Sequence, residues 1–395
     1  MLKNLVKALD QRLERRRLPA DAKEAIRQDA KGIPDDDPGI EQAVECAIDW
    51  LFRAQDRSTT ADGGVARHFS LVSGWGPSYP ETTGYIVPTV IDHWQRTRNA
   101  AARERARRML DWLVAIQFPE GGFQGGHVLS EPRVPVTFNT GQILLGLASG
   151  AAEFGDAYRA PMQRAADWLV ATQDPDGCWR RHATPFAAPG EKAYETHVAW
   201  GLLEAARVES NAQYADSALA NVRWALKQQA ENGWFAKCCL DDPIRPLTHT
   251  LGYALRGIVE AYRFTDDRLY LLAACKTADG ILSAVRADGY LPGRLNADWT
   301  PAVSWMCVTG AVQIAHCLLM LYEWTHEQRY LNTAVALNKC VRRTVRTGGR
   351  DDVRGGVKGA FPVDGDYGAL QYLNWACKFF IDANVLEQRI TRLAQ

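Results

Sequence analysis

The sequence predicts an all-α protein in which six helical hairpins close into an (α/α)6 toroid. Three observations predict this fold: a repeated tryptophan–glutamine pattern, a glycine-rich turn after each copy, and helical stretches that alternate between amphipathic and almost wholly apolar. A repeat at a fixed period indicates one supersecondary unit stacked several times. We expect a short N-terminal helical arm and linker over residues 1–38 and the toroid over residues 39–395.

The arm begins with a basic amphipathic segment, Met1 to Arg17, which lacks the continuous apolar stretch of a secretory signal. It ends at a cluster of helix breakers between Ile33 and Gly39. We expect the arm to pack on the body or, as the alternative, to bind a partner through its basic helix.

The repeat follows from Gly39 onward. Tryptophans recur at Trp50, Trp112, Trp168 and Trp224, and each is followed five residues later by Gln55, Gln117, Gln173 or Gln229. A glycine-rich turn comes next in every copy, and two weaker turns follow at 287–290 and 354–357. The period is roughly 55–60 residues, longer than that of most helical repeats. The four tryptophans lie on amphipathic helices, so we expect them to pack between two helix layers.

The second helix of each unit is nearly all apolar or small, as in residues 140–147 and 303–320. A helix that is apolar on every side is buried. These stretches therefore predict an inner ring rather than the open solenoid that simple stacking gives. We expect inner helices to begin near Glu81, Thr137, Tyr194, Leu247, Val303 and Asp366.

The turns at Gln173–Trp179 and Gln229–Trp234 resemble the repeats of squalene cyclases and protein prenyltransferases. They are also similar to the toroid domains of glucuronyl C5-epimerases, polysaccharide lyases and glycoside hydrolases. The resemblance covers about residues 39–390. It implies an (α/α)6 barrel with its site at the open end of the inner ring.

The first turns of the inner helices supply the candidate site. Pro80 suits the first position of a helix, and Glu81 is favoured near the positive end of its dipole. The candidate catalytic residues are Glu81, Glu195, His197, His249 and Tyr367. The candidate substrate-binding residues are Arg67, His68, Trp75, Tyr79, Tyr85, Asn139, Trp179, Trp234, Trp305, Asp364, Asp366 and Tyr372. N-capping is the alternative role for the threonine, serine and asparagine residues at such positions.

Basic and aromatic residues are frequent in the loops at this end. Aromatic rings stack on sugar rings and arginine binds carboxylates in a bidentate manner, so the pattern suits an acidic, uronate-containing saccharide. A solvated loop surface is the alternative. In uronate lyases and C5-epimerases, groups such as Tyr and His abstract the proton next to the carboxylate. A hydrolase would instead use Glu81 and Glu195 as a carboxyl pair.

Two further function classes stay open. A non-catalytic glycan-binding toroid would keep the aromatic and arginine residues without a titrating pair. An isoprenoid cyclase or prenyltransferase would need an aspartate-rich motif on an inner helix, whereas the aspartate runs at 35–37, 241–242 and 351–352 lie in expected loops. Cys238 or Cys239, Asp241 and His249 match no strong zinc signature, so we expect no metal and no other cofactor.

The composition of the chain limits the kinds of partner and compartment that we expect. The formal net charge is zero, which favours neither nucleic acid nor an anionic membrane surface. No run of about 18 apolar residues predicts a membrane span. Nine cysteines, an odd number mostly within helical patterns, favour a reducing compartment, and we expect a cytoplasmic protein.

Overall fold

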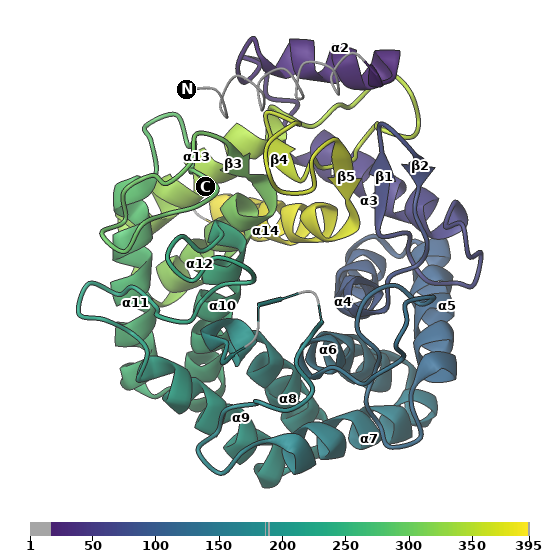
Figure 1. The fold of residues 1–395 in the computed structure, drawn as a ribbon, viewed down its shortest axis with the longest axis vertical. Helices are drawn as coiled ribbons and strands as arrows, with labels where there is room; N and C mark the ends of the chain where they lie inside the picture. Colours follow the sequence, from purple (N-terminus) through teal and green to yellow (C-terminus); the bar gives the residue numbers. More distant parts are fainter. Residues whose placement is uncertain (1–16, 186, 189, 394–395) are drawn as a thin grey trace, which may run out of the picture.

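The computed structural model describes residues 17–185, 187–188 and 190–393, and the helices of its body form a closed ring in two layers (Figure 1). The inner helices are α4 (Pro80–Thr97), α6 (Thr137–Phe154), α8 (Thr196–Glu209), α10 (Thr248–Thr265), α12 (Val308–Thr325) and α14 (Asn374–Leu393). The outer helices are α3 (Ile40–Asp56), α5 (Ala100–Ile116), α7 (Asp156–Thr172), α9 (Ala212–Leu226), α11 (Arg268–Ala284) and α13 (Gln328–Arg342). Neighbouring inner helices pack together, and α14 packs on α3 and α4, which closes the ring. The predicted toroid is confirmed.

Glycines let the inner helices approach closely enough to form a small ring. A Cβ atom on Gly146 would lie 2.3 Å from the carbonyl oxygen of Gly84, and one on Gly201 would lie 2.4 Å from that of Gly141. Any side chain would push these backbones apart. The small residues in the apolar stretches therefore set the circumference of the inner ring.

Short turns join most inner helices to the following outer helix. In three of them a residue in the left-handed conformation, Arg98, Ser210 or Asp266, is followed by an N-cap residue, Asn99, Asn211 or Asp267. The Asn99 side chain, for example, accepts a hydrogen bond from Ala101 N at 3.0 Å. This capping starts the next helix at once. The long connections consequently all lie at the opposite end of the ring, where the inner helices begin; we call this end the mouth.

The repeated tryptophan and glutamine residues hold the outer layer together. Trp50, Trp112, Trp168 and Trp224 are at most 7% exposed, as expected for packing residues. The Nε2 atom of Gln117 donates to the carbonyl oxygens of Gly121 and Pro161, both at 2.9 Å. The other three glutamines bond in the same way to the neighbouring outer helix. Each glutamine therefore joins its own unit to the next.

Short strands order the mouth loops. Strands β1 (His68–Ser70), β2 (Gly74–Trp75) and β5 (Gln371–Leu373) form an antiparallel sheet in the order β2-β1-β5, with His68 opposite Leu373. Strands β3 (Met306–Cys307) and β4 (Ala360–Phe361) form a second pair. The first sheet joins the first mouth loop to the last, so it closes the ring a second time.

Two expected helix starts are wrong. The inner helices of the last two units begin at Val308 and Asn374, later than the predicted Val303 and Asp366. The residues before these two helices form β3 and β5 and the turns beside them, and Pro301, Gly365 and Gly368 in these segments oppose a helix. The other four inner helices begin within two residues of the expected positions.

The arm lies across the last unit of the ring (Figure 1). Helix α2 (Ala20–Asp29) ends in Asp29, whose carboxylate accepts from Lys358 Nζ at 2.6 Å and from Val363 N at 2.8 Å. In the linker after α2, Asp37 pairs with Arg342 at 3.1 Å. The basic segment expected to bind a partner, Met1–Arg17, lies almost wholly outside the described residues. No helix in the described part of the chain combines the length and apolar character needed to cross a bilayer.

Candidate active site

Side chains from the first and last mouth loops meet the first turns of the inner helices near the ring axis. We call one group of them the central cluster: Arg67, Tyr79, Glu81, His249, Tyr253, Tyr367 and Trp375. Glu81 is the second residue of α4, and Trp375 is the second residue of α14. The helices that carry them, α4 and α14, pack against each other where the ring closes.

Glu81 is the titratable carboxyl of the central cluster. Burial raises its pKa to about 7, while the nearby Arg67 guanidinium and a hydrogen bond from the Tyr79 hydroxyl oppose the rise. Glu81 in turn contributes to the raised pKa values of Tyr85, Tyr253 and Tyr367. A carboxyl that titrates near neutral pH, partly open to solvent and surrounded by hydroxyl groups, is suited to general acid–base catalysis.

Arg67 is the unpaired cation of the cluster. Its guanidinium lies 4.8 Å from the ring centroid of Trp375 and 5.6 Å from that of Tyr79. Nη1 donates to Gln371 Oε1 at 3.3 Å, and Arg67 forms no ion pair with a carboxylate among the described residues. Two aromatic faces therefore hold a guanidinium with donors left over for an anionic ligand.

Other mouth cations are neutralised by the protein itself. Arg180 pairs with Asp174, Asp176 and Glu191. Arg294 pairs with Asp241, and Arg245 with Asp242. Most of the basic residues that the sequence placed in the mouth loops are thus paired with carboxylates, and Arg67 differs from them in having no such partner among the described residues.

Trp375 was not among the sequence candidates. Its Nε1 donates to the Tyr367 hydroxyl at 3.0 Å, which leaves the hydroxyl hydrogen of Tyr367 free to donate elsewhere. The indole also stacks on Arg67, so one buried side chain holds two groups of the cluster. Its signal in the sequence, a tryptophan in the first turn of the last inner helix, was hidden because that helix was expected to begin at Asp366.

His249 is held as a neutral imidazole. Its Nδ1 lies 2.7 Å from Gln313 Oε1, and because that oxygen accepts, we assign the hydrogen to Nδ1 and the lone pair to Nε2. Burial lowers the pKa of His249 to about 4, although the bond to Gln313 opposes this. The ring lies 4.3 Å from Tyr253 and 5.4 Å from Tyr367, centroid to centroid.

His197 lies deeper than the cluster. The side chain is fully buried, with Nδ1 2.6 Å from Gln142 Oε1 and the ring 4.4 Å from Tyr253. Burial, followed by the nearby cations Arg256 and Lys378, lowers its pKa well below the usual value. Because the side chain is fully buried against Tyr253, His197 belongs to the packed layer behind that ring. Its Nε2 has no hydrogen-bond partner among the described residues.

Glu195 also lies apart from Glu81. It is buried in the short 3-10 helix η1 (Ala193–Glu195), and burial raises its pKa to about 8 against the opposing charge of Lys192. Its carboxyl raises the pKa of Cys178 on the turn after α7. Neither Glu81 nor Glu195 contributes to the pKa shift of the other, so the two do not behave as a coupled pair.

Four of the aromatic candidates for substrate binding lie in packed positions. Trp75 Nε1 donates to Asp352 at 2.9 Å, and its ring lies 5.2 Å from Trp50. The other three are buried: Trp179 bonds to the carbonyl oxygen of Leu169, Trp234 packs on Trp299, and Tyr372 lies in β5. These contacts give each ring a structural role.

The remaining candidates surround the cluster. His68 lies beside Arg67 with Nδ1 3.4 Å from its guanidinium, and burial followed by the Arg67 charge lowers its pKa to about 4. Tyr85 and Asn139 are buried, and the Asn139 amide nitrogen has no hydrogen-bond partner among the described residues. Trp305 covers Gly293 and is half-buried, as is Asp364, whereas Asp366 is exposed. The ligand roles of all these residues stay predictions.

The described residues contain no group of three or more His, Cys, Asp or Glu side chains arranged to hold a metal ion. The acid–base and charged groups of the central cluster are Glu81, the tyrosine hydroxyls, the neutral His249 and the Arg67 cation.

No protein-family model and no curated protein matches the sequence. The fold, however, matches solved carbohydrate-active enzymes. An unsaturated glucuronyl hydrolase specific for heparin is 17% identical, with a TM-score of 0.71 over 89% of this chain and 98% of that one. The glycosaminoglycan-degrading unsaturated glucuronyl hydrolase of Bacillus sp. GL1 is 16% identical, with a TM-score of 0.70 and the same coverage. A D-mannose isomerase is 13% identical, with a TM-score of 0.71 over 89% of this chain and 97% of that one. At these identities the likeness establishes the (α/α)6 toroid fold.

Proposed function

We propose that this protein acts on a uronate-containing oligosaccharide, and that Glu81 is the general acid that protonates a terminal unsaturated uronate. The observation that carries the proposal is the Glu81 carboxyl, with a pKa of about 7, beside the unpaired Arg67 guanidinium. The fold shared with unsaturated glucuronyl hydrolases supports the substrate class.

A single carboxyl suits this reaction. An unsaturated uronate is an enol ether: the acid protonates C4, water adds at C5, and the water proton returns to the carboxylate. The resulting C5 hemiketal opens to a ketone at C5 and a hemiacetal at C1. The hemiacetal then collapses to an aldehyde, and its hydroxyl proton leaves with the C1 substituent as an alcohol. Hydrolysis of a saturated glycoside needs two carboxyls about 5–10 Å apart. Glu81 is the one carboxyl of the central cluster, so we base the proposal on the enol-ether reaction, which needs a single acid.

The other members of the cluster take supporting roles. Arg67 binds the substrate carboxylate, because its position between Trp375 and Tyr79 leaves guanidinium donors free. The Tyr367 hydroxyl, which accepts from Trp375, donates to a sugar oxygen. His249 accepts from a sugar hydroxyl through Nε2, since its Nδ1 is bound to Gln313.

The test is turnover of unsaturated glucuronyl disaccharides, followed by loss of the ultraviolet absorbance of the conjugated double bond. Replacing Glu81→Gln should lower kcat by about a hundredfold or more, the scale of a general acid. Because the acid form is active, kcat/KM should fall as pH rises through about 7. A rate that instead rises through this pH would make Glu81 a base and favour the lyase or epimerase reaction. Failure to consume any uronide would refute the proposal.

A sugar isomerase is the second candidate, and His249 favours it. A neutral imidazole with a free Nε2 can move a proton between neighbouring carbons of an open-chain sugar. The fold likeness to D-mannose isomerase supports testing it. Interconversion of aldose and ketose, lost in His249→Ala but kept in Glu81→Gln, would favour this reaction over the first.

A further inference from the structure

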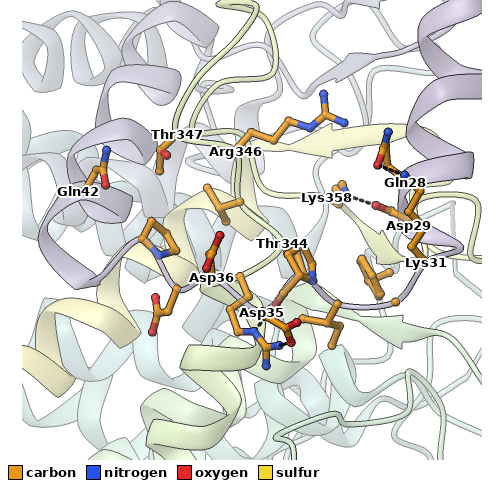
Figure 2. Close-up of a pocket in the computed structure, with 18 residues that line it drawn as sticks. Gln28, Asp29, Lys31, Asp35, Asp36, Gln42, Thr344, Arg346, Thr347 and Lys358 are labelled. Carbon is orange, nitrogen blue, oxygen red and sulfur yellow. Dashed lines mark hydrogen bonds and ion pairs between the residues drawn. The ribbon is translucent and has the colours of Figure 1, made fainter.

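A second pocket lies between the arm and the last unit of the ring. Its volume is about 660 Å³, within the range of ordinary ligand sites. It is lined by the end of α2, the linker that follows, the first turn of α3 and the loop after α13. Figure 2 shows these segments converging from different parts of the chain.

The floor of the pocket is rigidly built. Lys358 and Asp29 form an ion pair at 2.6 Å, with side chains only 4% and 6% exposed. Phe361 also lines the pocket, with Lys358 Nζ 5.3 Å from the centroid of its ring. A buried ion pair of this kind holds its partners in fixed positions, so the pocket does not depend on a loose surface loop.

One side of the pocket has unused positive charge. Arg346 is exposed and forms no ion pair or side-chain hydrogen bond among the described residues. Figure 2 shows it extended toward Gln28 and Lys358. Within the described ranges the Lys31 ammonium bonds to Gln28 Oε1 at 3.0 Å alone, which uses one of its three donors. An anion held between these groups would meet two cations without breaking an existing pair.

The other side offers acceptors. Asp35 is paired with Arg343 at 3.1 Å, whereas Asp36 has no ion-pair partner in the described part of the chain. Figure 2 shows Asp35 and Asp36 away from the Arg346 guanidinium. Among the described residues that line the pocket, Asp36 is the one carboxylate without an ion-pair partner, and it lies on the side opposite Arg346 (Figure 2). The pocket thus combines a cationic side with a side that accepts hydrogen bonds from hydroxyl groups.

We propose that this pocket is a second binding site for an acidic oligosaccharide, with the sugar carboxylate on Arg346 and Lys31 and its hydroxyls on Asp36. A uronate has this distribution of groups, because each ring carries one carboxylate together with hydroxyl groups. The ligand class rests on the proposed function, whereas the location does not. The loop 358–373 leads from this pocket to Tyr367, so a polymeric substrate would be held beside the mouth.

The test uses a saturated glucuronate-containing tetrasaccharide and isothermal titration calorimetry. In the Arg67→Ala background, which removes carboxylate binding in the central cluster, we expect binding to persist. Adding Arg346→Ala should weaken it about tenfold or more, the scale of a lost charge-assisted contact. The matched control is Arg392→Ala, an exposed arginine of α14 outside the pocket, which should leave binding unchanged. The carboxyl-reduced tetrasaccharide should not bind.

Three outcomes would overturn the second site: no binding in Arg67→Ala, unchanged binding on adding Arg346→Ala, or equal weakening by Arg392→Ala. None of them bears on turnover by Glu81. Conversely, absence of turnover with Arg346-dependent binding intact would refute the proposed function and leave the second site standing.

Discussion

Trp375 connects two side chains of the central cluster that come from opposite ends of the sequence. Its indole face carries the guanidinium of Arg67, and its Nε1 fixes the hydroxyl of Tyr367. We infer that it is a positioning residue whose two contacts act on different steps. In the proposed reaction the stacked arginine would bind the substrate carboxylate, and the oriented hydroxyl would act in the chemical step.

Trp375→Phe keeps an aromatic face for Arg67 but removes the hydrogen bond to Tyr367. We expect a drop in kcat of up to about tenfold with little change in KM, since a neutral hydrogen bond contributes about 1 kcal/mol. Trp375→Leu also removes the cation–π contact and should raise KM for uronides by about tenfold. Steady-state kinetics of both variants separates the effect on kcat from the effect on KM. Equal effects of both variants on KM would contradict the assignment; Trp75→Phe, which removes a hydrogen bond to Asp352, is the control.

The buried Glu195 carboxyl should make the stability of the folded protein depend on pH. Its pKa is about 8 in the folded protein against 4.5 as the ordinary value, because burial penalises the charged form. The folded state therefore binds the proton more tightly, and this group lowers stability as pH rises from about 4.5 to 8. The slope is about 1.4 kcal/mol per pH unit within that window.

Glu195→Gln removes this titration. We expect the variant to gain stability relative to the wild type as pH rises from 5 to 8, measured by chemical unfolding at each pH. The difference between the two proteins cancels the opposite contribution of buried histidines such as His249. A difference that stays constant with pH would show that Glu195 is not buried as an acid.

Close packing of the inner helices can be tested by adding a side chain where two backbones meet. A Cβ on Gly146 would meet the Gly84 carbonyl oxygen at 2.3 Å, and a backbone atom cannot move aside as a side chain can. Gly146→Ala should therefore lower stability by about 1–3 kcal/mol net, although alanine is the better helix former by about 1 kcal/mol. Gly348→Ala is the matched control because nothing lies within 4 Å of its Cβ position. A more stable Gly146→Ala protein in thermal unfolding would show that the inner ring has room to expand.

The helices could be predicted from the sequence where the repeat and the apolar pattern alone determine them. The repeated tryptophans and the apolar stretches predicted both helix layers, and four inner helix starts lie within two residues of expectation. The last two starts were wrong because β3 and β5 depend on pairing with distant segments, which periodicity does not encode.

The candidate site was predictable to a similar extent. Glu81, His249 and Tyr367 belong to one cluster because equivalent positions of a repeat face the same axis. Glu195 is not part of this cluster; it lies buried in η1, the short 3-10 helix that precedes α8. The glutamines Gln142 and Gln313, which orient the two histidines, come from neighbouring helices. Such contacts depend on helix packing, so the sequence alone did not reveal them.

The whole molecule depends on contacts between its two ends. Strands β1 and β5 pair, α14 packs on α3, and the arm is bound to the last mouth loop through Asp29 and Lys358. These contacts hold Arg67 from the first unit against Trp375 from the last. The central cluster is therefore complete only when the first and last units of the ring are in contact.

The ion pair between Lys358 and Asp29 closes the arm on the ring. Lys358→Met leaves Asp29 buried without its cation, and removing one partner of a buried pair costs about 3–5 kcal/mol. The double variant Lys358→Met, Asp29→Leu should recover only part of this, because Val363 N then loses its acceptor. Urea unfolding measures all three proteins. Arg27→Met, which breaks the exposed pair with Glu24, should change stability by less than about 1 kcal/mol. If Lys358→Met were as mild as this control, the arm would be a dispensable addition and the ring would close without it.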